Sequence, residues 1–231
     1  MLLPGLLATR RVWQNQIEAL SDIADIVVPE LYDHDSMGAM AEAALTAADQ
    51  HAKGAPFALA GFSMGGYVAL EILRRAASRV ERLALVDTQA TPDTPEATAR
   101  RLGFIEQTKI GRFKGVQPAI MPMILHPSRF KDTSVTQPIL DMALEVGAEG
   151  FVREQHATMG RADSRPMLGS IRVPTLVIVG RQDLTTPLAR AEEMAATIPN
   201  ARLVVIEECG HMSPLEKPAE VTAALRKWLD A

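Results

Sequence analysis

A serine held between glycines is the residue of this sequence best placed to do chemistry. The motif GFSMGG spans residues 61–66 and matches the pattern G-x-S-x-G. An apolar run ends just before it, and a stretch of helical periodicity begins just after it. A strand that turns directly into a helix strains the serine backbone, and Gly61 and Gly65 remove side chains that would collide there. The pattern predicts Ser63 as a nucleophile, with the Met64 backbone N–H at the helix N-terminus able to receive an oxyanion.

A base and an acid that could serve this serine follow two later predicted strands. A serine hydroxyl is a poor nucleophile near neutrality and needs a base to take its proton. His211 lies in a loop after an apolar run, and the ordinary histidine pKa of about 6.5 suits that task. Asp183 follows another such run and could hold the imidazole in the required tautomer. The order nucleophile, acid, base predicts a catalytic triad of Ser63, Asp183 and His211.

Short apolar runs alternate with helix-period segments along much of the chain. The predicted strands are 1–3, 25–28, 56–61, 83–86, 175–179 and 202–206. The predicted helices of this part are 12–20, 36–53, 64–77, 188–198 and 218–229. Continuous apolar runs are typical of strands buried on both faces, and strand–helix alternation indicates a parallel sheet. The predicted fold class is therefore α/β, with a mostly parallel sheet of about six strands flanked by helices.

Residues 88–167 break this rhythm. They show helical periodicity at 97–107, 135–146 and 150–159 but no convincing strand, and five of the eleven methionines fall among them. A long strand-free insertion between two sheet strands predicts a helical lid over a core formed by residues 1–87 and 168–231. The alternative is that these helices merely pack on the sheet.

Four motifs give the chain a resemblance to a known family over essentially its whole length. They are LLPGLL (2–7), GFSMGG (61–66), VGRQDLTTP (179–187) and GHMSPLEKP (210–218). With them the chain resembles the lidded α/β-hydrolases of the carboxylesterase and enol-lactonase type. In that family a His-Gly pair after the third strand opens the oxyanion loop. Pro4-Gly5 stands in its place here, so the resemblance implies that the backbone N–H of Leu6 completes the oxyanion hole with that of Met64.

The same resemblance raises two questions about strands and acids. The family normally has two strands before this point, and this chain starts at the third. If the sequence is complete, all six predicted strands can be parallel and the strand 25–28 becomes an edge of the sheet. An exposed edge strand pairs readily with another chain, so we expect either a homodimer contact there or covering by Trp13 and the first helix. Asp87 follows the strand 83–86 and is the rival acid; Asp183 is preferred because the motif around it matches.

Composition excludes several other classes of protein. The net charge of -4, with both signs scattered, indicates no nucleic-acid partner and no anionic membrane surface. No apolar run approaches the ~18–20 residues that cross a bilayer, and Arg10 and Arg11 follow the apolar N-terminus in the wrong order for a secretory signal. Cys209 is the single cysteine and is predicted to be a small buried thiol. We expect a soluble, cytoplasmic protein.

This chemistry requires no metal or organic cofactor. The sequence Asp33-His34-Asp35 contains possible metal ligands, but its spacing fits a polar loop before a helix better than a metal site. His126 and His156 fall in the predicted lid, where they could contact substrate, but solvated surface positions are the preferred expectation. The apolar, methionine-bearing lid favours a small, neutral or weakly polar ester as substrate. A lactonase, a thioesterase or a C–C hydrolase would share the triad. A receptor that retains the triad, or a cofactor-free lyase or oxygenase in which Ser63 is never acylated, remains a further alternative.

Overall fold

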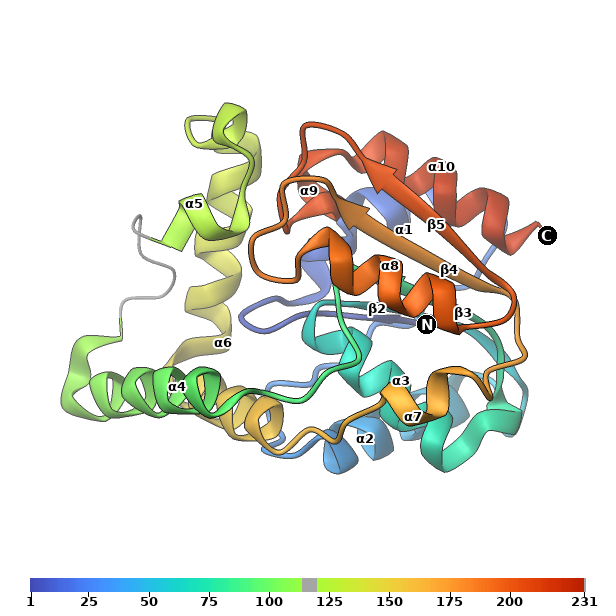
Figure 1. Ribbon diagram of the computed structural model, residues 1–231, viewed down its shortest axis with the longest axis horizontal. Helices are drawn as coiled ribbons and strands as arrows, with labels where there is room; N and C mark the ends of the chain where they lie inside the picture. Colours follow the sequence, from blue (N-terminus) through green and yellow to red (C-terminus); the bar gives the residue numbers. More distant parts are fainter. Residues whose placement is uncertain (114–119, 231) are drawn as a thin grey trace.

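The computed structural model describes residues 1–113 and 120–230. A single parallel sheet runs through it in the order β1-β2-β3-β4-β5, so that neighbours in space are also neighbours along the chain (Figure 1). Its strands are β1 (Leu2–Leu3), β2 (Phe57–Phe62), β3 (Val80–Val86), β4 (Thr175–Gly180) and β5 (Ala201–Ile206). The prediction of an α/β fold with a parallel sheet is confirmed.

Helices cover both faces of the sheet. On one face lie η1 (Arg10–Trp13), α1 (Gln14–Leu20), α9 (Ser213–Glu216) and α10 (Pro218–Leu229). On the other lie α2 (Met37–His51), α3 (Met64–Ala76), α7 (Arg165–Leu168) and α8 (Leu188–Thr197), and the short η2 (Ala77–Arg79) follows α3. The helix predicted over 36–53 begins as expected, because the Ser36 side chain accepts the Ala39 N–H and caps it.

The central strands are buried on both faces, which explains their unbroken apolar sequence. In β3, Ala84 and Val86 belong to the cluster under α1 and α10, whereas Leu83 and Leu85 belong to the cluster under α2, α3 and α8. Side chains of β4 alternate in the same way between the two clusters. Successive side chains of a strand point to opposite faces, so both faces of this sheet need apolar residues.

The strand predicted over residues 25–28 is not formed, and the sheet has five strands where about six were expected. Only one backbone hydrogen bond, from the Leu2 N–H to the Val27 carbonyl (2.9 Å), joins this segment to β1. β1 is two residues long and pairs with β2 on its other side, and its single bond to residues 25–28 does not continue into a second ladder. Ile26 and Val28 are half-buried against the core instead.

Trp13 packs against one face of the sheet at β1 and β2. Its ring meets Phe62 edge-on, with 6.2 Å between centroids, and its indole N–H donates to the Leu3 carbonyl (3.1 Å). The side chain is fully buried. The homodimer contact therefore stays a prediction, and the outer side of residues 25–28 is where it would form.

The segment between β3 and β4 contains no strand within its described residues, 88–113 and 120–167. Its helices are α4 (Pro95–Gln107), η3 (Thr108–Arg112), α5 (Met121–Ile124), η5 (Pro127–Arg129) and α6 (Thr133–Met159). Figure 1 shows α4, α5 and α6 grouped at one side of the sheet, beyond the arrowheads of β4 and β5. α6 is interrupted at Gly147, whose φ of 69° is not helical. Met142 and Ile139 of α6 join the core cluster, so this helix also packs on the core.

No helix in the described part of the chain is long and apolar enough to cross a bilayer.

Candidate active site

Ser63 occupies the sharp turn that the sequence predicts. β2 ends at Phe62 and α3 begins at Met64, which leaves Ser63 alone between them with φ 51° and ψ -115°. This left-handed region is unfavourable for a residue with a side chain and is found where the surrounding structure enforces it. A Cβ on Gly61 would overlap the Gly65 backbone, and one on Gly65 would overlap the backbone of the loop after β1. Both glycines are therefore needed for the turn to close.

The three predicted triad side chains meet at the carboxyl ends of their strands. His211 Nε2 lies 2.9 Å from Ser63 Oγ, and His211 Nδ1 lies 2.8 Å from Asp183 Oδ2. His211 and Asp183 are 4% and 3% exposed. Phe62 packs against the imidazole, with 5.4 Å between ring centroids. Charge–charge interaction in this buried setting is much stronger than in water.

Asp183 is held as an acceptor by the loop that follows it. Its Oδ1 accepts the backbone N–H groups of Thr185 (2.8 Å) and Thr186 (2.9 Å), and its Oδ2 accepts the Thr186 hydroxyl (2.7 Å). Burial alone would raise the pKa of Asp183, but His211 and these donors together hold it below its ordinary value. Burial likewise would lower the pKa of His211, and the charge of Asp183 raises it above its ordinary value. The pair is thus arranged to favour an ionised carboxylate beside the imidazole.

Asp87, the rival acid, lies close by but makes no hydrogen bond to His211 among the described residues. Its Oδ1 accepts the Gly180 N–H (3.0 Å) and its Oδ2 accepts the Ser213 N–H (3.1 Å). Burial, and then the charge of Asp183, raises the pKa of Asp87 to about 8. It therefore ties the loop that carries Asp183 to the loop that carries His211. The carboxylate that contacts the imidazole is that of Asp183.

The loop around His211, residues 209–213, is fixed through its backbone. Five successive N–H groups all donate to partners outside the loop. The partners, in order from Cys209 to Ser213, are Gln182 Oε1, Glu216 Oε1, the Ile124 carbonyl, Glu216 Oε1 and Asp87 Oδ2. With each peptide unit held, the imidazole has little freedom to turn away from Ser63.

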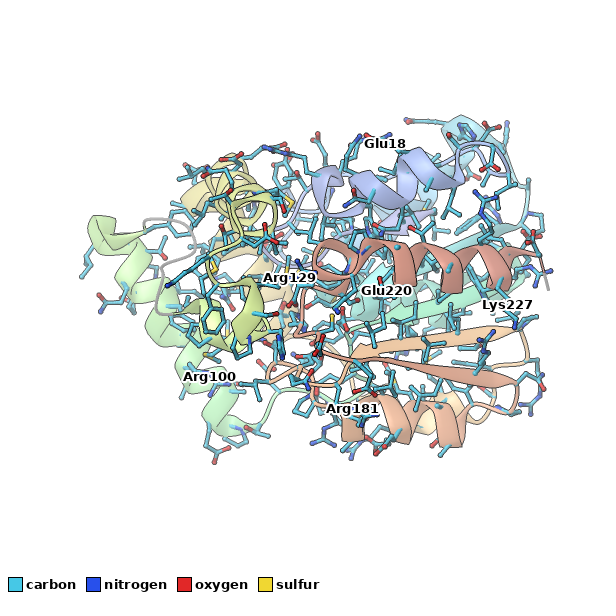
Figure 2. The ribbon with its side chains drawn as sticks, turned by 90° about the horizontal axis from the view of Figure 1, so that it is seen from above. Glu18, Arg100, Arg129, Arg181, Glu220 and Lys227 are labelled. Atoms are coloured by element: carbon cyan, nitrogen blue, oxygen red, sulfur yellow. The ribbon has the colours of Figure 1, made fainter. Side chains whose placement is uncertain are left out.

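Glu216 is a functional neighbour that the sequence reasoning missed. It is 1% exposed, and burial raises its pKa above the ordinary value. Besides the histidine loop, it holds the inserted segment: its Oε2 accepts the His126 N–H (2.8 Å), and its carbonyl accepts from Arg129 (2.9 Å), labelled in Figure 2. The available signal was the motif GHMSPLEKP, in which this glutamate stands five residues after the histidine.

The two predicted oxyanion donors lie beside Ser63. Residues 4–9, hereafter the oxyanion loop, pass so close that a Cβ on Gly5 would lie 3.1 Å from Ser63 Cβ. Among the described residues, neither the Leu6 N–H nor the Met64 N–H has a hydrogen-bond acceptor. The Met64 N–H belongs to the first turn of α3, where helix geometry leaves it unpaired.

The remaining candidates play no visible part in this arrangement. Cys209 is buried and free, and burial raises the pKa of its thiol. Asp33 contacts Arg153 (3.4 Å), and no group of three acidic, histidine or cysteine side chains in the described part of the chain could hold a metal. His156 is exposed as expected, whereas His126 is half-buried beside the histidine loop.

A parallel sheet with this strained serine turn, and with histidine and aspartate brought to it from later strands, defines an enzyme of the α/β-hydrolase class. The family described as "Alpha/beta hydrolase family" matches residues 1–225, and the chain belongs to that family. The resemblance drawn from the four motifs is confirmed, and the protein is a hydrolase.

Three similar proteins illustrate the relationship. An esterase from Thermogutta terrifontis is 33% identical, with a TM-score of 0.89 over 99% of this chain and 88% of that one. A pimeloyl-[acyl-carrier protein] methyl ester esterase from Neisseria meningitidis serogroup B (strain H44/76) is 31% identical over 74% of this chain and 67% of that protein. The enol-lactonase from Burkholderia xenovorans LB400 is 24% identical, with a TM-score of 0.88 over 100% of this chain and 90% of that one, and shares the fold.

Proposed function

We propose that the protein is a serine esterase that cleaves small carboxylic esters through an acyl-enzyme. Ser63 is the nucleophile, His211 the general base and Asp183 the acid that orients the histidine. The observation that carries this proposal is the unbroken path of contacts from Asp183 Oδ2 through the imidazole to Ser63 Oγ, at 2.8 and 2.9 Å. The two esterases among the similar proteins support the choice of ester bonds.

In the acylation step His211 Nε2 takes the proton of Ser63 while Oγ forms a bond to the ester carbonyl carbon. The carbonyl oxygen becomes an oxyanion, which the free N–H groups of Leu6 and Met64 receive. The tetrahedral intermediate then collapses: the bond to the alkoxy oxygen breaks, and the imidazolium gives its proton to the departing alcohol. Asp183 stabilises the imidazolium while it exists.

In the deacylation step water replaces the alcohol. His211 takes a proton from the water molecule as its oxygen bonds to the acyl carbon, and the same oxyanion donors receive the negative charge. When the bond to Ser63 Oγ breaks, the proton on His211 passes to that oxygen. The carboxylic acid leaves and the free enzyme is restored.

Residues 88–167 form the lid in this proposal. Their described parts contact both loops of the site: η5 and the residue before it reach the histidine loop through Glu216, and α6 reaches the oxyanion loop. The apolar residues and methionines of this segment favour a neutral or weakly polar ester over a charged one.

A panel of p-nitrophenyl esters of increasing acyl length, with lactones and acyl thioesters beside them, tests the proposal. We expect steady turnover of short acyl esters by the wild type, its loss in Ser63→Ala, and labelling of Ser63 by a fluorophosphonate probe found by mass spectrometry. Labelling without turnover would favour a receptor that retains the triad. Turnover that survives Ser63→Ala would contradict the proposal.

A further inference from the structure

Three side chains of α6, on both sides of its interruption at Gly147, accept hydrogen bonds from the oxyanion loop. The Leu7 N–H donates to Glu154 Oε2 (2.9 Å), the Thr9 N–H to Met142 Sδ (3.4 Å), and the Thr9 hydroxyl to Glu145 Oε2 (3.2 Å). These contacts join residues more than a hundred positions apart in the sequence. The helix of the proposed lid is thus bonded directly to the loop that carries an oxyanion donor.

Glu154 stands out among these partners because it is a buried carboxyl group. It is 1% exposed, and it has no ion pair within the part of the chain that the structure describes. Its neighbour Arg153 points elsewhere, to the Tyr32 carbonyl and to Asp33. Burial raises the pKa of Glu154 to about 8, against the opposing effect of the Leu7 N–H. A buried carboxyl group is unfavourable unless it is hydrogen-bonded, and among the described residues Glu154 has one such bond, from the Leu7 N–H.

Leu7 itself is in a conformation that needs support. Its φ of 55° lies in the left-handed region, which a leucine side chain disfavours. The bond to Glu154 occupies the Leu7 N–H, whereas the neighbouring Leu6 N–H has no acceptor among the described residues. Without an acceptor at Glu154, the loop would relax toward ordinary backbone angles, and the orientation of the Leu6 N–H would no longer be fixed.

We propose that Glu154 is a positioning residue that holds the oxyanion loop through the Leu7 N–H and so keeps the Leu6 N–H directed at the reacting carbonyl. This inference rests on the proposed esterase function. It also makes the lid helix a structural part of the oxyanion hole.

Replacement of Glu154 by leucine and by glutamine tests the proposal. Glu154→Leu removes the acceptor, and we expect kcat on p-nitrophenyl acetate to fall about 10- to 100-fold, with KM changed by less than about two-fold, because the donor acts on the oxyanion and not on the ground-state ester. Glu154→Gln keeps an amide oxygen that can accept the Leu7 N–H, and we expect it to keep at least about half of kcat.

Gln155→Leu is the matched control. Gln155 is the next residue of α6, 3% exposed, and accepts from Arg101 (2.7 Å) without contact to the oxyanion loop. Gln155→Leu removes a part-buried hydrogen-bond acceptor of α6 that serves Arg101 and not the oxyanion loop, so we expect lower stability with kcat within about two-fold of the wild type. Equal kcat values for Glu154→Leu and Gln155→Leu would overturn the proposal, as would a Glu154→Gln variant as slow as Glu154→Leu.

A second readout reports on the oxyanion hole directly. A trifluoromethyl ketone binds by adding Ser63 Oγ to its carbonyl carbon as the serine proton passes to His211, which leaves an oxyanion in the hole. Its Kd should rise in Glu154→Leu by the same factor by which kcat/KM falls. An unchanged Kd in a folded variant would overturn the proposal.

Hydrogen exchange separates this inference from the proposed function. The Leu7 amide should exchange slowly in the wild type and at least about ten-fold faster in Glu154→Leu, whether or not esters are turned over. If Glu154→Leu does not fold, Glu154→Asp replaces it: the shorter side chain withdraws the acceptor, so Leu7 should exchange faster than in Glu154→Gln. Equal exchange in the two variants would overturn the inference, while a wild type inactive on every ester overturns only the proposed function.

Discussion

Two buried carboxyl groups, those of Asp183 and Asp87, lie near the imidazole of His211. Their hydrogen-bond partners differ, and so do their proposed roles. Asp183 faces Nδ1, whereas both oxygens of Asp87 are occupied by backbone N–H groups. Asp183 also accepts donors from Thr185 and Thr186, so what separates the two carboxylates is the 2.8 Å contact of Asp183 Oδ2 with His211 Nδ1. The local geometry supports Asp183 as the proposed orienting acid, and Asp87 links two loops.

Substitution by asparagine should separate these two roles. Asp183→Asn leaves the imidazole in the wrong tautomer, and we expect kcat to fall by about 10³–10⁴-fold. Asp87→Asn should keep kcat within about ten-fold of the wild type but lower the free energy of unfolding by about 1–3 kcal/mol, because one backbone N–H then faces an amide NH₂. Ester turnover and denaturant unfolding of both variants measure this. The reverse pattern of activities would make Asp87 the acid.

The pH dependence of the reaction should reflect the raised pKa of His211. The base works only when neutral, and the Asp183 charge raises its pKa above 6.5. Protonation of His211 therefore begins at a higher pH than in a free imidazole, and kcat/KM should fall as the pH drops, with its half-point above 6.5. In Asp183→Asn the residual activity should show this limb at lower pH. A wild-type limb at or below the ordinary histidine value would contradict the assignment.

At the scale of elements, the turn from β2 to α3 depends on a close approach that only glycine permits. We expect Gly65→Ala to destabilise the protein by about 1–3 kcal/mol, because its Cβ would overlap the backbone of the oxyanion loop. Gly103→Ala is the matched control: Gly103 lies in α4 with nothing within 4 Å of its Cβ position, and alanine there should stabilise by about 0.5–1 kcal/mol. Thermal unfolding of both compares them, and equal shifts would refute the steric argument.

The histidine loop offers a second test at this scale. Glu216→Leu removes the acceptor of three backbone N–H groups, the buried ones of Gly210 and Met212 and the part-buried one of His126. Because each orphaned donor costs about 1–3 kcal/mol, we expect a loss of at least about 3 kcal/mol in unfolding free energy, together with a lower kcat. Glu220→Leu makes the same change at an exposed position of α10 (Figure 2) and should stay within about 0.5 kcal/mol. A Glu216 variant as stable as this control would show that other groups fix the loop.

At the scale of the whole molecule, parallel strands bring distant residues together. Ser63, Asp87, Asp183 and His211 each follow a different strand among β2 to β5, and these four strands are consecutive in the sheet. Because the strands all run the same way, the loops after them gather at one edge. The inserted helices lie beyond the same edge and contact both loops of the site, so the core and the proposed lid are joined where the chemistry is proposed to occur (Figure 1).

At the same scale, the structure leaves open whether a second copy of the chain covers the outer side of residues 25–28. Size-exclusion chromatography tests the homodimer hypothesis. An elution mass twice the chain mass of 25.0 kDa would support pairing along this segment, and a monomer would remove it.

Most of the fold could be predicted from apolar runs and helical periodicity in short stretches of the sequence. The strands β2 to β5 and the helices α2, α3, α8 and α10 lie within a few residues of their predicted bounds, because apolar runs and helical periodicity act over short stretches of chain. The segment 25–28 has the same apolar pattern but no strand to pair with over its length, since β1 is only two residues long. Strand formation depends on a partner, which no local pattern specifies.

The sequence by itself determined the serine turn, the order of the three triad candidates and a parallel sheet buried on both faces. These features depend on backbone sterics and side-chain periodicity, which neighbouring residues specify. The tertiary structure decided which carboxylate meets His211, and it revealed Glu216 and Glu154, whose partners come from far along the chain. Those choices depend on packing and on the pairing of buried polar groups. Such pairings exist only once distant segments have been brought into contact.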